Sequence, residues 1–400
     1  MNLILFDDAP VRSNLLPLTY TRPIAELRVG ILTIREKWEK WLNGVASYIT
    51  EDYLASKYPI QVAKENIVIN ASVLPSEQLA QLVRQLDTNE ALLQGEELIA
   101  AKLDEVQFDR LMNDEEIDEL QGFDVEDTPF ERILHPYDIF LKNGVEIERD
   151  FELLTAGRTS QPLPTSNQVS HPERVFIEEG AVVECAMLNA KAGAIYIGKD
   201  AEIMEGSVVR GPFALCDNSK LKMGAKIYGG TTIGPWSKVG GEVSNSVITG
   251  YSNKGHDGYL GNSVLGEWCN LGAGTNNSNL KNNYAEVKLW NYEAKRFLKT
   301  GQQFCGLIMG DHSKSGIGTT FNTGTVVGVS CNIFGAGFPR NFIPSFSWGG
   351  AAGFKTYQDD KAMDTAERVM KRRRKSLEVT DRVVLIRIYE DSAPYRTWDK

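Results

Sequence analysis

The stretch "IYIGKDAEIMEGSVVRGPFALCDNSKLKMGAKIYGGTTIGPWSKVG" (195–240) carries a pattern that decides the fold of half the chain. An aliphatic residue recurs at every sixth position: Ile197, Ile203, Val209, Leu215, Leu221, Ile227, Ile233 and Val239. Neither the 3.6-residue period of a helix nor the two-residue alternation of an ordinary strand requires this spacing. A hexapeptide repeat is typical of a parallel β-helix, in which each short strand forms one side of a coil.

The repeat also places small residues two positions before most of the aliphatic ones, for example Ser207, Ser219 and Ser237. We expect the aliphatic side chains to stack along the axis and the small ones to fit near the corners. The repeat breaks at 241–260 and again at 280–316. Irregular loops on a rigid scaffold often carry binding groups, so these breaks are the first places to look for a site.

Residues 1–160 lack the six-residue period. "LILF" (3–6) and "NIVIN" (66–70) are typical of short buried strands. Helical apolar spacing follows in 30–42 and 76–86, with Ser76 a plausible N-cap. Strands that alternate with helices predict an α/β layer with a mostly parallel sheet, whose ligands bind beyond the carboxyl ends of the strands.

These patterns predict four segments. They are an α/β domain at 1–154, a Pro/Ser/Thr-rich linker at 155–173, a β-helix domain at 174–350 and an extension at 351–400 that contains a helix and a strand. The basic run Arg372–Lys375 ends that helix; it fits a phosphate or nucleic-acid contact, but a solvated helix end or a subunit contact is favoured.

Composition restricts the class of protein. The net charge of −10 argues against broad affinity for nucleic acid or membranes, although a local group of lysines and arginines can still hold a phosphate. The five cysteines are scattered without C-x-x-C spacing, which favours a reducing compartment. The apolar start "MNLILF" lacks a basic leader and is too short to span a membrane, so we expect a cytoplasmic protein.

The segment "NSVITGYSNKGHDGYLGNSVLGEWCNLGAGTNNSNLKNNYAEVK" (245–288) combines H-x-x-Y-x-G with N-x-G-A-G-T. In these motifs the chain resembles the bifunctional sugar-1-phosphate nucleotidylyltransferase/acetyltransferases, in a divergent Bacteroidetes-type branch. The N-terminal stretch "RSNLLPLTYTRPIAELRVG" (12–30) resembles the nucleotidyltransferase opening of the same family. The resemblance implies a left-handed β-helix, a homotrimer, and synthesis of UDP-N-acetylglucosamine or a related nucleotide sugar from a sugar phosphate, acetyl-CoA and a nucleoside triphosphate.

The resemblance also assigns roles to residues of the β-helix. It places His256 as the general base, and imidazole suits proton removal from an amine near neutral pH. Asn279 would orient the amine or the imidazole, while Tyr259, Asn270 and Lys288 would bind substrate. Each has an alternative: a loop histidine without a task, a ring packed between coils, turn asparagines or a solvated lysine. His312 is a weaker candidate for coenzyme contact.

The chain departs from the family pattern in several places. Ser244 stands where bacterial members have a lysine, so Lys254 or Lys238 would rebuild the sugar-phosphate clamp. In the first domain "DDAPVRS" replaces the Gly-rich phosphate loop, and Ser72 replaces the magnesium-binding Asp. Mg²⁺ would then need Asp7 or Asp8, and Arg12 and Arg22 would contact the nucleotide or form surface ion pairs.

Three hypotheses about function follow. The first is the complete bifunctional enzyme. The second is an acetyltransferase whose N-terminal domain binds a nucleotide sugar without catalysis, as Ser72 and the lost glycine loop suggest. The third is a non-catalytic sensor of sugar nucleotides. The fold alone does not choose among them.

Overall fold

The computed structural model describes residues 1–113 and 120–399. Contacts divide them into two units. The first contains residues 1–15, 22–27 and 32–135, and the second contains residues 16–21, 28–31 and 136–400. No helix among the described residues is long and apolar enough to span a bilayer.

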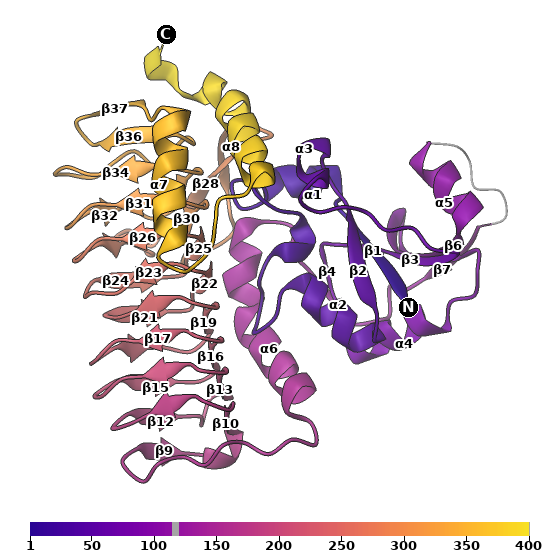
Figure 1. The fold of residues 1–400 in the computed structure, drawn as a ribbon, viewed down its shortest axis with the longest axis horizontal. Coiled ribbons are helices and arrows are strands. Elements are labelled where there is room, and N and C mark those ends of the chain that lie inside the picture. The colour runs from indigo at the N-terminus through magenta and orange to yellow at the C-terminus, as the bar shows by residue number, and fades with distance from the viewer. Residues whose placement is uncertain (114–119, 400) are drawn as a thin grey trace. The chain divides into compact units, whose positions relative to one another are not determined.

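The first unit is built on one mixed six-stranded sheet (Figure 1). Its strands run in the order β2 (Val45–Ile49), β1 (Asn2–Phe6), β3 (Glu65–Asn70), β6 (Glu97–Asp104), β5 (Glu90–Gln94) and β7 (Gln121–Asp124). The predicted strands at 3–6 and 66–70 are therefore confirmed. β1 pairs in parallel with both neighbours, whereas β6 is antiparallel to β3 and β5.

The first unit contains the helices α1 (Ala9–Asn14), α2 (Ile34–Leu42), α3 (Asp52–Ala55), α4 (Glu77–Gln85) and α5 (Glu105–Met112). Of these, α2 and α4 lie in the two segments with predicted helical spacing, 30–42 and 76–86. α2 begins after a capping box at Thr33, and the Ser76 side chain caps α4 by accepting from the Leu79 amide. A short antiparallel pair, β4 (Val73–Leu74) and β8 (Glu131–Arg132), completes the unit.

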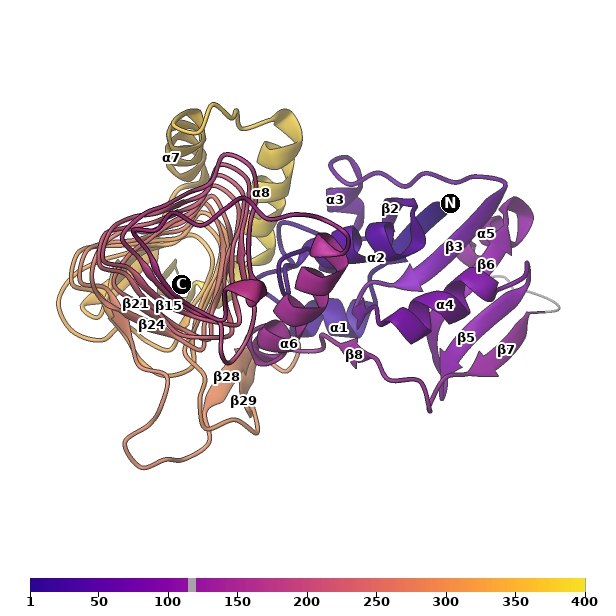
Figure 2. The same ribbon diagram turned by 90° about the horizontal axis from the view of Figure 1, so that it is seen from below.

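The second unit is the predicted left-handed parallel β-helix. Seen along its axis the coils superpose as a triangle (Figure 2). Two long sheets form two of its sides. One contains β10 (Val175–Ile177), β13 (Ile195–Ile197), β16 (Phe213–Leu215), β19 (Thr231–Ile233), β22 (Val247–Gly250), β25 (Val264–Glu267), β30 (Leu307–Met309), β33 (Thr325–Val327) and β35 (Phe342–Ile343).

The other long sheet contains β11 (Val182–Val183), β14 (Glu202–Ile203), β17 (Lys220–Leu221), β20 (Lys238–Val239), β23 (Asn253–Lys254), β26 (Asn270–Leu271), β31 (Lys314–Ser315), β34 (Asn332–Ile333), β36 (Ser347–Gly350) and β37 (Gly353–Thr356). The third side contains β9 (Gln168–Ser170), β12 (Met187–Asn189), β15 (Val208–Arg210), β18 (Lys226–Ile227), β21 (Glu242–Ser244) and β24 (Tyr259–Gly261), and is continued by the pair β27 (Asn276–Asn277) and β32 (Thr320–Phe321).

The core of the β-helix is the predicted aliphatic stack. Ile197, Leu215 and Ile233 are register partners on successive coils and are fully buried in one hydrophobic cluster. The small residues Ser207, Ser219 and Ser237 are fully buried too. Since each coil buries its apolar side only against its neighbours, the stack stabilises the β-helix as a whole.

The two breaks in the repeat have different structural causes. At the first, Ile233 pairs with Ile248, so the coil is shorter than its neighbours. At the second, Leu265 pairs with Met309, and the intervening insertion forms the antiparallel hairpin of β28 (Lys288–Asn291) and β29 (Arg296–Lys299). The first break therefore removes residues from a coil, whereas the second adds an element.

One expectation is corrected. The segment 382–390, expected to be a strand, lies within helix α8 (Val379–Asp391), which follows α7 (Asp359–Lys371). Val384, Leu385 and Ile388 bury one side, but exposed Val383 and Ile386 make the run apolar on both faces, which resembles a strand. By its contacts α6 (Pro136–Thr155) groups with the β-helix unit. Asn143 joins α6 to the coils by donating to Gly230 O at 2.8 Å and Thr232 Oγ1 at 3.0 Å.

Candidate functional site

A buried lysine stabilises the turn that carries His256 through hydrogen bonds to backbone carbonyls. Lys254 is 2% exposed, and its Nζ donates to Gly240 O at 2.9 Å and to His256 O at 3.0 Å. Burial lowers the pKa of Lys254 to about 8. The His256 side chain is exposed. Lys254 thus stabilises the backbone of the turn, and its ammonium does not face outward as a phosphate clamp would.

Tyr259 and Asn279, both predicted as site residues, lie in contact. Asn279 Nδ2 donates to the Tyr259 hydroxyl at 2.9 Å and to Asn262 Oδ1 at 2.7 Å. The Tyr259 backbone amide donates to Asn276 Oδ1 at 2.8 Å. Burial raises the pKa of Tyr259, while the Asn279 bond acts in the opposite direction. The phenol is therefore a fixed neutral hydroxyl at neutral pH.

The structure explains why the motif H-x-x-Y-x-G has a glycine at position 261. A Cβ at this position would collide with the Tyr259 hydroxyl and lie 2.8 Å from the Asn279 amide nitrogen. The Tyr259 ring can therefore lie along the outer face of β24 only because residue 261 has no side chain. Asn262 and Asn276 were not predicted from the sequence; their only signal was the asparagine-rich composition of the same stretch.

Asn270 lies on a different side of the triangle from Tyr259. Its side chain is exposed on β26, where it is the register partner of Asn253 and Lys314. Within one chain the structure therefore brings Tyr259 and Asn279 together but leaves Asn270 on the neighbouring face. His312, the weaker coenzyme candidate, is buried and stacks on Trp268 with ring centroids 6.3 Å apart.

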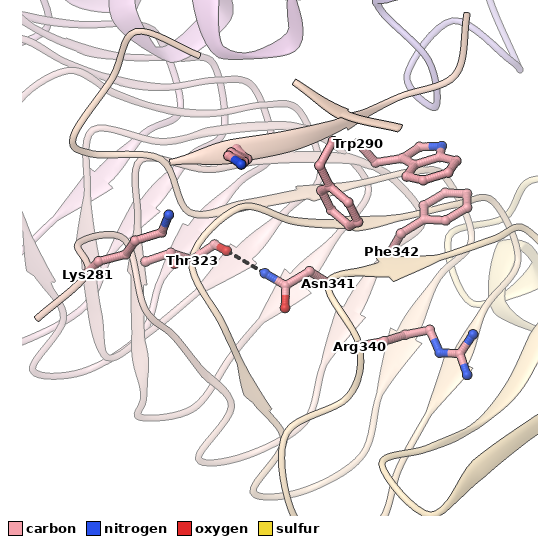
Figure 3. Close-up of a pocket in the computed structure, with 8 residues that line it drawn as sticks. Lys281, Trp290, Thr323, Arg340, Asn341 and Phe342 are labelled. Carbon is pink, nitrogen blue, oxygen red and sulfur yellow. Dashed lines mark hydrogen bonds between the residues drawn. The ribbon is translucent and has the colours of Figure 1, made fainter. Parts of the chain in front are cut away.

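Lys288 lines a pocket between the hairpin and the edge of the coils (Figure 3). The cavity measures about 570 Å³ and is lined by Lys281, Lys288, Trp290, Phe297, Thr323, Arg340, Asn341 and Phe342. Trp290 stacks on Phe342 at 4.1 Å between ring centroids, and Asn341 Nδ2 donates to Thr323 O at 2.8 Å. Three cations beside aromatic rings suit an anionic ligand. Lys281 and Arg340 were not predicted, because their neighbourhood depends on the fold of the insertion.

In the first unit the predicted ligand residues are engaged with one another. Arg12 pairs with Asp7 at 2.8 Å, and both side chains are almost fully buried. Asp7 also accepts from the Ile24 amide at 2.8 Å and from Thr50 Oγ1 at 2.6 Å. Burial raises the pKa of Asp7, against the effect of Arg12. Arg22 is 6% exposed. Both arginines are thus buried rather than part of surface ion pairs.

This donor set does not fit a magnesium site. Asp8 caps α1 by accepting from the Val11 amide at 3.1 Å, and both oxygens of Asp7 already accept hydrogen bonds. Ser72 is buried and donates to Asn70 Oδ1 at 2.7 Å. Across residues 1–113 and 120–399, no three His, Cys, Asp or Glu side chains gather as metal ligands would. We therefore derive no metal-dependent step from this structure.

Comparisons with known proteins agree with the resemblance. Residues 3–159 match the family model for sugar nucleotidyl transferases. A bifunctional sugar-1-phosphate nucleotidylyltransferase/acetyltransferase of Sulfurisphaera tokodaii is 33% identical over 144 residues, which is 36% of this chain and 35% of that protein. A bifunctional GlmU protein of Methanocaldococcus jannaschii is 38% identical over 92 residues, 23% of this chain and 22% of that protein. The chain thus matches about a third or less of the length of these relatives.

Solved structures similar to the chain include two UDP-N-acetylglucosamine acyltransferases. The one from Campylobacter jejuni is 13% identical, covers 58% of this chain and 95% of its own, and has a TM-score of 0.27. The one from Arabidopsis is 12% identical, covers 58% of this chain and 91% of its own, and has a TM-score of 0.28. The sequence matches confirm the predicted resemblance: the chain is similar to bifunctional sugar-phosphate nucleotidyl- and acetyltransferases, and the relatives it matches are transferases.

Proposed function

We propose that the β-helix unit transfers an acetyl group from acetyl-CoA to the amine of an amino-sugar 1-phosphate such as glucosamine 1-phosphate. The observation that carries this proposal is the hydrogen-bonded group of Tyr259, Asn279 and Asn262 on the coil next to the His256 turn. Two of its members, with His256, stand at family positions, and the relative named as a nucleotidylyltransferase/acetyltransferase supports the same reaction.

The chemistry assigned to these residues is direct. The sugar amine attacks the thioester carbonyl, a C–N bond forms, and the C–S bond breaks as coenzyme A leaves as its thiolate. The exposed His256 imidazole accepts the proton that the amine loses and returns it to the leaving sulfur. Asn279 fixes the Tyr259 hydroxyl, which is then available to a sugar or phosphate oxygen.

The exposure of His256 in a single chain favours an assembly of several copies of the chain. A base that faces open water in one chain gains a drier, more selective site when a second copy covers it. We therefore propose that the protein acts as a homotrimer with sites between protomers. Lys288 and the pocket around it would contact the phosphate-bearing ligand.

For the first unit we propose binding of a nucleotide or nucleotide sugar. Nucleotidyl transfer that yields UDP-N-acetylglucosamine or a related nucleotide sugar is the fuller form of the proposal, and the match over residues 3–159 supports it. The commitment of Asp7 to Arg12 and the N-cap role of Asp8 favour the second candidate, a unit that binds without catalysing transfer.

The test compares two histidines in one fold. His256→Asn should lower release of coenzyme A thiol by about 10²–10⁴-fold with acetyl-CoA and glucosamine 1-phosphate. His171→Asn is the matched control, because His171 is exposed and its φ of +58° is tolerated by asparagine. Equal rates for the two variants would remove His256 from the mechanism. Pyrophosphate release from UTP, Mg²⁺ and N-acetylglucosamine 1-phosphate would support the bifunctional form, and its absence would support the silent first unit.

A further inference from the structure

One row of side chains on the β-helix gathers positive charge. Lys220 on β17, Lys238 on β20 and Asn253 on β23 are register partners on adjacent strands. Partners on neighbouring strands lie about 4.8 Å apart, so these side chains form a continuous row on the outer face. Lys222 follows two residues after Lys220 and lies close to the next coil, where its Cβ would be 3.2 Å from a Cβ placed on Gly240.

The basic end of α7 reaches the same row. Arg373 follows the last turn of α7, and its Nη2 donates to Asn253 Oδ1 at 3.1 Å. The Nε of Arg373 is buried and has no hydrogen-bond acceptor within the described residues. The sequence favoured a solvated helix end or a subunit contact for this run. Instead, Arg373 folds back onto Asn253, 120 positions earlier in the chain.

Little negative charge balances the cluster, which we define as Lys220, Lys222, Lys238, Arg372 and Arg373. Lys220 pairs with Glu202 at 2.5 Å. Among the described residues no carboxylate lies within 4.0 Å of the charged groups of the other four. Burial, together with the positive charges of Arg373, Lys220, Lys222 and Arg372, lowers the pKa of Lys238. Burial and Arg372 lower the pKa of Arg373.

We propose that this cluster is a binding site for a multivalent phosphate group, with Arg373 and Lys238 as its main ligands. Guanidinium and ammonium groups form strong charge-assisted hydrogen bonds with phosphate oxygens, and a buried Nε without an acceptor gives one such oxygen a defined place. A phosphate there would also relieve the repulsion among five cations in a chain whose net charge is −10.

The position of the cluster indicates the source of the phosphate. Asn253, which anchors Arg373, precedes His256 by three residues. If the proposed acetyl transfer is correct, the phosphate belongs either to the amino-sugar phosphate or to coenzyme A. Of the two lysines expected to rebuild the clamp, Lys254 is turned inward, so Lys238 is the one available to the ligand.

The experiment measures pyrophosphate binding by titration calorimetry on the full chain at low ionic strength. Lys238→Gln and Arg373→Gln should each weaken binding by tenfold or more, whereas Lys191→Gln, at an exposed lysine elsewhere on the β-helix, should leave it unchanged. Tryptophan fluorescence of each variant checks that the β-helix is intact. Equal affinity in all four proteins, or equally tight binding of duplex DNA by the intact chain, would overturn the site.

Two further titrations identify the source and separate this proposal from the proposed function. A loss of affinity in the same variants for glucosamine 1-phosphate assigns the phosphate to the sugar, and a loss for coenzyme A assigns it to the coenzyme. If acetyl transfer is absent but pyrophosphate binding still depends on Lys238 and Arg373, the site stands and the proposed function falls. If acetyl transfer proceeds but pyrophosphate binding does not depend on Lys238 and Arg373, the proposed function stands and the phosphate site falls.

Discussion

The burial of Lys254 predicts how the free energy of unfolding changes with pH. Its pKa falls from 10.5 to about 8 on folding, because burial disfavours the charged form. Below pH 8 the ammonium is charged in both the folded and the unfolded chain, so the folded protein carries the full free-energy cost of burying that charge. Between pH 8 and 10.5 the folded chain releases this proton first, and the free energy of unfolding rises with pH.

The perturbation is Lys254→Met, which removes the titrating group. From pH 7 to pH 9.5, linkage gives the wild-type protein a gain of about 2 kcal/mol that the variant lacks. The assay is urea denaturation followed by tryptophan fluorescence at both pH values, with Lys226→Met as the control at an exposed lysine of β18. If the difference in free energy of unfolding between wild type and variant is the same at both pH values, Lys254 does not titrate with a lowered pKa.

Three other changes test separate parts of the structure. Ile233→Ala, in the fully buried stack, should lower the free energy of unfolding by about 2–5 kcal/mol in urea denaturation; a loss below about 1 kcal/mol would contradict the stacked core. Asn279→Ala should reduce kcat/KM for acetyl transfer by about tenfold or more, because the Tyr259 hydroxyl and Asn262 lose a donor; Asn282→Ala, at an exposed neighbour, should leave it unchanged, and equal rates would exclude a positioning role. Asp7→Asn should destabilise the first unit by about 3–5 kcal/mol because the buried Arg12 loses its closest carboxylate; a variant of wild-type stability would show that the ion pair is not structural.

The β-helix could be predicted from the sequence because its repeat is local. Each coil repeats the same inward position, so the spacing of Ile197, Leu215 and Ile233 alone indicates that they share one buried environment. No distant contact has to be known. The prediction of a strand at 382–390 was wrong for the opposite reason. A helix packed on one side can carry β-branched residues on its exposed face, and only the tertiary contacts of Val384 and Ile388 show which face is buried.

The candidate site was predictable in part. Tyr259 and Asn279 stand in one sequence stretch, and the structure joins them by a hydrogen bond. Lys254 was expected at the substrate, yet two backbone carbonyls hold its ammonium inside the turn. Arg373 was assigned to a helix end because the sequence does not show that the chain returns to β23. A periodic sequence pattern does not show long-range contacts of this kind.

Acetyl transfer by the intact chain can be measured from both of its products. The full chain is incubated with acetyl-CoA and glucosamine 1-phosphate while free thiol and the N-acetylated sugar are measured together, the latter by mass spectrometry. We expect thiol and N-acetyl sugar phosphate in equal amounts, and both should fall by at least about a hundredfold in His256→Asn. Thiol release without an acetylated sugar, or no turnover by the wild-type chain, would contradict the proposed acetyl transfer.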